Sequence, residues 1–254
     1  MKRNAKKLLG FSIGASDGEI GKVKDFYFDD VSWTIRYLVV ETGTWLSGRQ
    51  VLISTQALRG ADWEKETFPV NLTKEQVKNS PDIDTTKPIS RKHELLLHQY
   101  YPWTGYWEGG LWGGGVIGTS GMMMHVTEPL EDAIRRSSGG EGTEDQGYDP
   151  HLRSVVNVTG YSIRNANDTI GEIADFIVDD ESWQISFLVA DTGNWLPGKK
   201  VLLSPKWIQD MDWETEVVHV QHSAEQIKHS PEYEPDRYID AEYENRLHTH
   251  YDQF

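Results

Sequence analysis

The sequence contains no cysteine among its 254 residues. This absence excludes disulfide bonds, thiolate metal sites and cysteine nucleophiles, and it is compatible with the cytoplasmic location that we expect. Long apolar runs are also missing, since no window reaches the roughly 20 apolar residues of a membrane-spanning helix. The uncharged stretch from Gly109 to Met124 comes closest, but it is short and rich in glycine. The sequence therefore predicts no membrane span.

Positive charge is scarce, because 25 Lys and Arg residues face 40 Asp and Glu residues and leave a net charge of -15 at pH 7. Such a chain repels phosphate backbones, since non-specific nucleic-acid binding depends on Lys and Arg displacing counterions. We therefore expect no direct nucleic-acid partner. Hydrophobic residues make up 37 % of the chain, which is enough to build packed cores, so we expect a folded globular protein.

Four basic residues near the N-terminus precede an uncharged stretch from Leu8 to Ser16, as in a signal peptide. The stretch is short for the apolar part of a signal peptide and contains two glycines. Its segment Gly10–Ile13 also recurs as Gly160–Ile163 in the second half of the chain. We therefore expect these residues to form the first strand of a domain.

The chain consists largely of an internal duplication. Residues 10–101 align with residues 160–251 at a constant offset of 150 without a gap, and about 40 % of the aligned positions are identical, which chance does not produce. The alignment predicts a first domain over residues 8–104 and a second over residues 152–254. Residues 105–151 between them are rich in glycine and are expected to form a linker.

Each copy contains a pattern typical of a β-hairpin. Runs rich in aromatic and β-branched residues at Ile20–Asp30 and Thr34–Glu41 flank a polar turn at Asp30–Trp33. The second copy repeats the two runs at Ile170–Asp180 and Gln184–Asp191. Further short strands, spaced as in a small barrel, are expected at Gln50–Ser54, Trp63–Leu72, Lys200–Ser204 and Trp213–Gln221.

Two helices are expected to complete each copy. Thr73–Gln76 and Ser223–Gln226 have the pattern of a helix N-cap, and each of these short helices is followed by a proline. A second helix is predicted near Ser90–Tyr100 and near Asp240–His250. The predicted fold class is mainly β, with two small barrels in tandem, short accessory helices and approximate two-fold pseudosymmetry.

The segments Arg36–Val40 and Ser186–Ala190 do not alternate apolar with polar residues, so each strand is expected to be covered on both faces. One face fills the barrel, and the other must meet a helix, the linker or the sister barrel. We hypothesise that the two halves cover each other, as in a homodimer fused into one chain. Residues 1–104 made alone would then fold and self-associate. The whole chain would be a monomer with an internal pseudo-dimer, or a homodimer.

The hairpin and the residues after it resemble the PRC-barrel family. The resemblance rests on the run from Asp29 to Leu52, which contains Ser32-Trp33, Glu41-Thr42-Gly43 and Trp45-Leu46, and on its counterpart from Asp179 to Leu202. It implies an SH3-like, partly open barrel of six strands, similar to barrels in the photosynthetic reaction centre H subunit and the ribosome maturation factor. In both of those settings the barrel docks on a larger complex. The resemblance therefore implies a bacterial binding or scaffold protein with a protein partner, no cofactor and no catalytic residues.

The tripeptide Asp191-Thr192-Gly193 follows an apolar strand and matches the motif of aspartic proteases. That mechanism requires two aspartates that share one proton, and the first copy supplies Glu41 instead. We therefore expect Asp191 to be a turn acid that caps backbone amides before a left-handed glycine. Its carboxylate is expected to lie far from that of Glu41. A hydrolase acting through this region is the less favoured alternative to a binding protein.

Residues that recur in both copies are most economically explained by the fold that the copies share. We expect them to serve core or turn packing. The set comprises Gly21, Gly171, Gly43, Gly193, Trp33, Trp183, Trp45, Trp195, Trp63 and Trp213.

Tryptophans without a counterpart in the other copy are better candidates for binding a partner. The densest aromatic segment runs from Tyr100 to Trp107 and, if exposed, would form a binding patch. The alternative is that this segment plugs the groove between the barrels. The candidate surface comprises Tyr100, Tyr101, Trp103, Tyr106, Trp107 and Trp112, with the unrepeated Trp207 as a further candidate.

A small-ligand or metal-binding sensor is the other alternative function. Histidines concentrate in the second half, and His248, His250 and Asp252 could in principle hold a divalent ion. Two histidines two residues apart on a helix, however, point to different faces. The pairs Asp29-Asp30 and Asp179-Asp180 are interpreted as solvated turn residues, with weak Ca²⁺ binding left open. No metal or cofactor is assigned.

Overall fold

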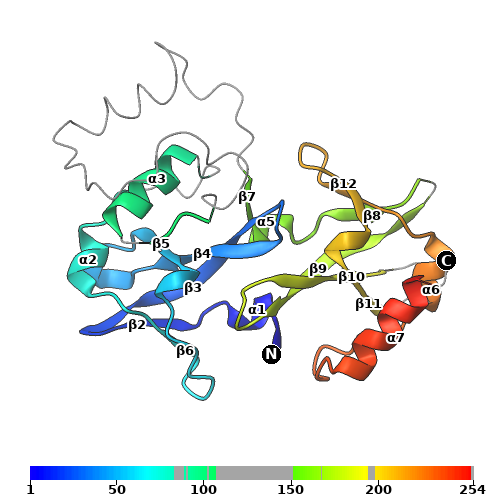
Figure 1. Cartoon of the computed structure of the whole chain (residues 1–254), viewed down its shortest axis with the longest axis horizontal. Helices are drawn as coiled ribbons and strands as arrows, with labels where there is room; N and C mark the ends of the chain where they lie inside the picture. The colour runs from blue at the N-terminus through cyan, green and yellow to red at the C-terminus, as the bar shows by residue number, and fades with distance from the viewer. Residues whose placement is uncertain are drawn as a thin grey trace, which may run out of the picture.

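The computed structural model describes residues 1–82, 89, 91–101, 103–106, 151–166, 168–193 and 198–252. Each repeat forms its own sheet, and the two sheets build two small barrels that lie next to each other (Figure 1). The helices α3 (Arg91–Tyr100) and α7 (Ala241–Asp252) each lie on the outside of one barrel (Figure 1). The mainly β fold class with short accessory helices is confirmed.

The first sheet has six strands. Five of them follow the spatial order β5-β4-β3-β2-β6, the sixth comes from the second half of the chain, and only the pair β2 and β6 is parallel. These strands are β5 (Gln50–Ser54), β4 (Thr34–Glu41), β3 (Gly18–Asp29), β2 (Ser12–Ala15) and β6 (Thr67–Pro69). The 3-10 turn η1 (Gly43–Leu46) lies between β4 and β5, and η2 (Thr55–Ala57) lies between β5 and β6. The helix α2 (Lys74–Lys78) follows β6 and precedes α3.

The second sheet repeats this order as β11-β10-β9-β8-β13-β12, and β8 and β13 are again parallel. Its strands are β11 (Lys200–Leu203), β10 (Ile185–Asp191), β9 (Thr169–Asp179), β8 (Ser162–Arg164), β13 (Val217–Val220) and β12 (Ile208–Asp212). The 3-10 turn η3 (Pro205–Trp207) and the helix α6 (Ala224–His229) complete this half.

The predicted hairpins are confirmed as β3–β4 and β9–β10. Their turns are equivalent, because Trp33 and Trp183 both adopt a left-handed backbone with φ of 55° and 60°. The strands expected to begin at Trp63 and Trp213 are shorter than expected. Both tryptophans lie in tight turns, so β6 begins at Thr67 and β13 at Val217.

The short helices α2 and α6 begin at the predicted caps. The Thr73 hydroxyl accepts the Gln76 backbone N–H at 3.1 Å, and the Gln76 side chain accepts the Thr73 backbone N–H at 2.8 Å. Ser223 and Gln226 repeat this capping box with distances of 3.2 and 2.7 Å. A repeated capping box satisfies the same helix-end donors in both copies and fixes where each helix begins.

Two equivalent glycines allow a close approach of strands. A Cβ on Gly21 would lie 2.0 Å from the Glu41 carbonyl oxygen, and a Cβ on Gly171 would lie 2.0 Å from the Asp191 carbonyl oxygen. Val51 and Val201 also occupy matching registers, opposite residue 40 and residue 190. The prediction that the two halves form the same barrel is therefore confirmed.

The strand β4 is covered on both faces, as its composition predicts. The cover over Tyr37 comes from α3 of the same half, because the Tyr37 hydroxyl donates to the Glu94 carboxylate at 3.1 Å. In the second half the Phe187 ring packs near His248 of α7. Lys2 of the first half also lies 5.5 Å from the Phe187 ring centre. Over this face each barrel's own helix therefore provides cover, and the other half contributes to it over Phe187.

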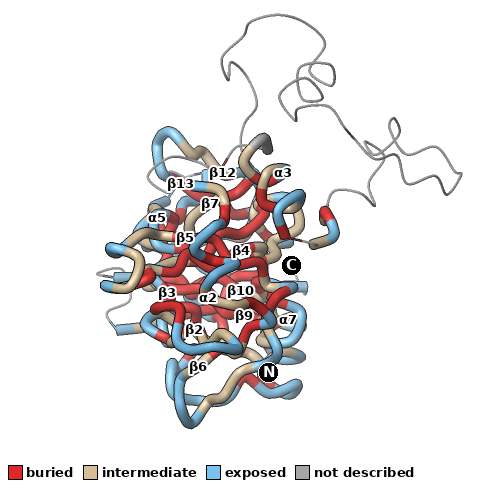
Figure 2. Tube along the Cα trace, turned by 90° about the vertical axis from the view of Figure 1, so that its left-hand side faces the viewer, coloured by how far each residue is buried: buried red, intermediate tan, exposed pale blue. Residues whose placement is uncertain are grey.

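Each half begins with a short arm that crosses to the other half. The first arm contains β1 (Lys2–Asn4) and α1 (Ala5–Leu8), and the second arm contains β7 (Leu152–Ser154) and α5 (Val155–Val158). The strand β1 pairs with β9, and β7 pairs with β3. The buried apolar residues of both halves form one cluster, and Figure 2 shows them gathered along the strands. The expected domain start at residue 8 leaves most of the first arm out.

Candidate interaction surfaces

The contacts between the halves repeat about a pseudo-two-fold axis. Thr34 and Gln184 form an antiparallel bridge at this axis. The Ile35 backbone N–H donates to the Trp183 carbonyl at 2.8 Å, and the counterpart bond, displaced by 150 residues, measures 2.7 Å. An interface in which residue i meets j while j meets i is isologous, as in a symmetric homodimer.

An aspartate in each half, buried at Asp175 and half-buried at Asp25, holds the arm of the other half. The Asp175 carboxylate accepts the Lys6 backbone N–H at 3.0 Å and the Asn4 side-chain amide at 2.9 Å. Asp25 makes the counterpart contacts with the second arm, at 3.0 Å to a backbone N–H and 2.5 Å to the Ser154 hydroxyl. Burial raises the pKa of the Asp25 carboxyl above its usual value, although these hydrogen bonds oppose the shift.

An arginine in each arm lies between an acid and a tryptophan. The Arg3 Nε atom is 3.1 Å from the Asp180 carboxylate, and the guanidinium lies 4.0 Å from the centre of the Trp63 ring. Arg153 repeats this arrangement with Asp30 at 2.8 Å and a tryptophan ring at 4.0 Å. A guanidinium stacked on an indole keeps its edge free for a carboxylate, so the two contacts support each other.

The acidic pairs at the ends of β3 and β9 therefore do more than line a solvated turn. Asp29 is 7 % exposed and accepts the backbone N–H groups of Val31 and Ser32 at 2.9 and 3.0 Å. Asp30 and Asp180 face the two arms. Asp29 and Asp179 are turn residues that cap backbone N–H groups, as this interpretation expects. Asp30 and Asp180 are not solvated, because the arms cover them.

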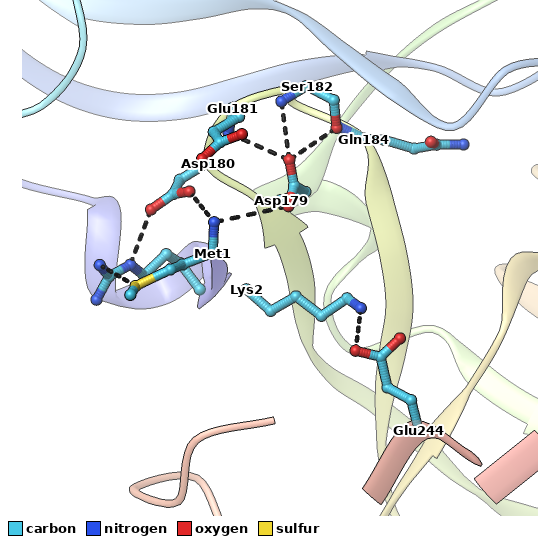
Figure 3. A network of polar contacts seen from close by, with 9 residues as sticks. Met1, Lys2, Asp179, Asp180, Glu181, Ser182, Gln184 and Glu244 are labelled. Atoms are coloured by element: carbon cyan, nitrogen blue, oxygen red, sulfur yellow. Dashed lines mark hydrogen bonds and ion pairs between the residues drawn. The ribbon is translucent and has the colours of Figure 1, made fainter. Parts of the chain in front are cut away.

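The first arm makes ion pairs that the second arm does not repeat. Lys2 forms an ion pair with Glu244 on α7, as Figure 3 shows. Lys7 Nζ lies 2.9 Å from an Asp236 oxygen. The amino group of Met1 also contacts the acidic pair at the end of β9 (Figure 3).

The corresponding positions of the second arm are uncharged, since Leu152 replaces Lys2 and Asn157 replaces Lys7. The second arm keeps only the arginine and a neighbouring histidine, whose Nδ1 lies 3.1 Å from Asp30. The two arms thus share the same backbone pairing and differ in charge.

The described part of the aromatic segment after α3 folds back onto the first half. Tyr101 is 1 % exposed, and the Trp103 ring stacks on it with ring centres 4.1 Å apart. The Tyr106 hydroxyl donates to Glu94 at 2.8 Å, and the Arg36 guanidinium lies 4.0 Å from the Tyr106 ring centre. Tyr101 is therefore wrongly placed in the candidate partner surface, because it is buried. The contacts of the described segment are with the first half and do not form a plug between the barrels.

The PRC-barrel domain model matches residues 3–77 and again residues 151–227. These two matches cover more than half of the chain. The chain belongs to the PRC-barrel family. Both matches include most of an arm, so the arm segments lie within the matched domains. No curated protein matches the chain.

Within the residues that the structure describes, neither PRC barrel carries a helix long and apolar enough to cross a membrane. Trp107 and Trp112 of the candidate surface, the repeated Trp195 and residues 107–150 of the expected linker lie outside the described residues.

The repeated tryptophans that are described pack within the PRC barrels or between them. Trp33 stacks on Phe28 with ring centres 5.3 Å apart. Trp183 of the second barrel reaches the first, where its ring lies 5.5 Å from that of Phe68. The Trp45 indole N–H donates to the Ile20 carbonyl at 2.5 Å.

Trp207, the further candidate for partner binding, is 8 % exposed and packs on Tyr251 of α7, with ring centres 4.2 Å apart. Because this contact buries its ring, the proposal of Trp207 as a partner residue is wrong.

The Asp191 carboxylate accepts the Gly193 backbone N–H at 2.9 Å, and Gly193 has a φ of 52°. Lys200 lies 3.8 Å from Asp191, and Lys24 lies 3.0 Å from Glu41 in the first barrel. The interpretation of Asp191 as a turn acid before a left-handed glycine is confirmed.

The histidines of α7 have separate partners. His250 Nε2 lies 2.7 Å from the Gln226 carbonyl, whereas the His248 ring packs 5.5 Å from that of Trp207. The pKa of His222, which packs in the same aromatic cluster, is lowered by burial. In the described part of the chain, no group of three or more His, Asp or Glu side chains is arranged to hold a metal ion.

Proposed function

We propose that the protein is a non-enzymatic scaffold that docks on another protein through the outside of its first PRC barrel. PRC-barrel domains commonly serve as protein-interaction modules. The polar groups that would attract attention as catalytic candidates have structural partners, because Asp191 caps a turn while Asp25 and Asp175 hold the arms. This arrangement supports a binding role for the two barrels.

The observation that carries the proposal is a difference between the outer helices of the two barrels. On α3, Leu95 is 43 % exposed and Tyr100 is 39 % exposed. At the equivalent positions of α7 stand Asn245 and His250. The Tyr100 hydroxyl donates to a carbonyl of α2 at 2.8 Å, and His250 contacts the equivalent carbonyl of α6 at 2.7 Å, so the difference between the helices lies at Leu95. Two copies of one fold show which residues the fold requires, and an exposed leucine in one copy opposite an exposed asparagine in the other is not required by packing.

The chemistry of the partner follows from the charge of this protein. A chain with a net charge of -15 attracts basic surfaces and repels acidic ones. We therefore propose a partner protein with an apolar patch for Leu95 and Tyr100 and with Lys or Arg residues around that patch. Among the described members of the expected aromatic surface, Tyr100 is the one classed as exposed.

The test compares matched variants of the full chain, Leu95→Lys on α3 and Asn245→Lys on α7. Both positions are exposed, so both variants are expected to melt at the wild-type temperature. Proteins cross-linked to each variant in its native cell are then identified and quantified. We expect the wild type and Asn245→Lys to capture the same partner and Leu95→Lys to lose it. Equal capture by all three proteins would exclude α3 as the docking surface.

A further inference from the structure

Besides the hydrogen bonds of Asp25 and Asp175 to the arms, which we call the aspartate latches, the exchanged arms bury apolar residues against the other half. Ala5 and Leu8 of the first arm are 0 % and 2 % exposed, and Val155 and Val158 of the second arm are each 2 % exposed. Each barrel therefore has a seat that is filled by the other half, along β9 for the first arm and along β3 for the second. Each seat contacts one arm and the end of one hairpin. These contacts would be the same if the arm and the hairpin belonged to a second copy of the chain.

We propose that a second copy of this chain is a partner at this interface, with the first half of each chain pairing with the second half of the other. The interaction lies at the seats between the halves and is separate from docking on α3. Two chains exchanged in this way would form all the contacts of the closed monomer, since the interface is isologous.

The charges of the arms select which halves pair. A pair of first halves would bring Lys2 towards Glu94, which is 2 % exposed and already accepts hydrogen bonds from Tyr37 and Tyr106. The ion pair of Lys2 with Glu244 would be lost.

A pair of second halves would also lose this ion pair, because Leu152 would take the place of Lys2 next to Glu244. The aspartate latches and the stacked arginines occur in both halves, so they support every pairing equally. Only the pairing of a first half with a second half keeps the ion pairs of Lys2 and Lys7.

Closure within one chain competes with exchange between chains. Covalent connection of two modules gives an effective concentration on the order of a millimolar when the linker is short, and this value falls as the linker lengthens. Exchange between chains is therefore expected to rise with total protein concentration and to become substantial as that value is approached. Chains that are unfolded and refolded together pass through the open state, so refolding populates both arrangements.

Because the chain contains no cysteine, any disulfide bond in a variant must join the cysteines that were introduced. Thr34 and Gln184 face each other between the two hydrogen bonds of the axis, which places their Cα atoms about 4.5 Å apart as a non-hydrogen-bonded antiparallel pair. That separation is inside the range of about 4.4 to 6.8 Å for disulfides. The chain with both Thr34→Cys and Gln184→Cys is expected to cross-link internally, which shows that the geometry supports the bond.

The full-length Thr34→Cys and Gln184→Cys chains are then unfolded, mixed, refolded at a series of concentrations and oxidised. We expect a disulfide-linked dimer in the mixture, increasing with concentration, and at least several-fold less dimer when either variant is refolded alone. Glu244→Lys in the Gln184→Cys chain removes the same ion pair from the closed and the exchanged arrangement, so it weakens only the preference for a first half over another second half. We expect it to raise the dimer that this chain forms alone relative to the dimer in the mixture.

Two outcomes would overturn the proposal. If the doubly substituted chain cross-links internally while the mixture gives no dimer near a millimolar, the halves pair only within a chain. If each single variant alone gives as much dimer as the mixture, the arms do not select their partner.

Discussion

Trp103 stacks on Tyr101 with ring centres 4.1 Å apart and an angle of 18° between the rings. In the second barrel Trp207 packs on Tyr251, the counterpart of Tyr101, at 4.2 Å. The two tryptophans come from different places in the sequence, because Trp103 follows α3 and Trp207 ends η3. The position of Trp207 is occupied in the first barrel by Ala57. Each barrel thus places one tryptophan over the same tyrosine, supplied from a different segment.

This relationship predicts that the tryptophan can be moved. Trp103→Ala is expected to lower the free energy of unfolding by about 3 kcal/mol, because it uncovers the Tyr101 ring. Adding Ala57→Trp to that variant is expected to restore much of the loss, since the side chain then arrives from η2 as it does in the second barrel. Urea unfolding of the wild type, the single variants and the double variant measures the effect. If Ala57→Trp destabilises equally with and without Trp103, the two positions do not serve the same site.

The Asp25 latch predicts a pH dependence of stability. Its pKa is raised by burial above the ordinary value of 3.8, so the folded protein binds more protons than the unfolded chain between these two values. The contribution of Asp25 to stability is therefore greatest below about pH 3.8 and decreases as the pH rises through its raised pKa. Asp25→Asn is expected to remove this decrease, which urea unfolding at a series of pH values measures.

Asp62 provides the control for the Asp25 measurement. Hydrogen bonds and charge from Lys65 lower the pKa of Asp62, so its contribution is present above the ordinary pKa and is lost as the pH falls. Asp62→Asn should change the pH profile in the opposite direction from Asp25→Asn. If both variants change the pH profile of stability in the same direction, the opposite pKa shifts of Asp25 and Asp62 are contradicted.

The close approach of strands at Gly21 and Gly171 predicts that an alanine at either position lowers the free energy of unfolding by a similar amount. A methyl group at either position would lie 2.0 Å from a carbonyl oxygen, so Gly21→Ala and Gly171→Ala must move the backbone. We expect each to cost about 3 kcal/mol of unfolding free energy or more, at the upper end of overpacking substitutions. Gly14→Ala, whose methyl group would meet only a Thr67 methyl at 3.3 Å, is the milder comparison. Calorimetric melting of the three variants decides whether the barrels respond alike.

Much of this fold can be predicted from local patterns in the sequence. The hairpins follow from runs of β-branched and aromatic residues, and the helices α2 and α6 follow from Thr73 and Ser223 with a glutamine three residues later. The exchanged arms cannot be predicted in this way. A strand of three residues shows no periodicity, and the partner of Arg3 lies 177 residues away.

The aromatic candidates show a second limit of sequence analysis. Tyr101 and Trp207 look like exposed anchors in composition, but both are buried. Trp103, two residues further along the chain, stacks on Tyr101, and Tyr251 of α7 packs on Trp207. The sequence does contain a sign of this burial, because two tryptophans lack a counterpart in the other copy. Ala57 stands where the second copy has Trp207, and Gln253 stands where the first copy has Trp103. A large residue missing from one repeat indicates that another residue fills the same space.

The exchanged arms also determine the order in which the protein can mature during translation. The first arm is synthesised long before its seat on β9, since Arg3 and Asp180 are separated by 177 residues. At about 5–20 residues per second, the ribosome needs about 9–35 s to make that stretch. The end of β3 also waits for β7, and an unpaired strand edge invites pairing with neighbouring nascent chains. Closely spaced ribosomes on one message would thus favour pairing between halves of different chains. Translation rate and ribosome spacing would then influence how many chains pair their own two halves.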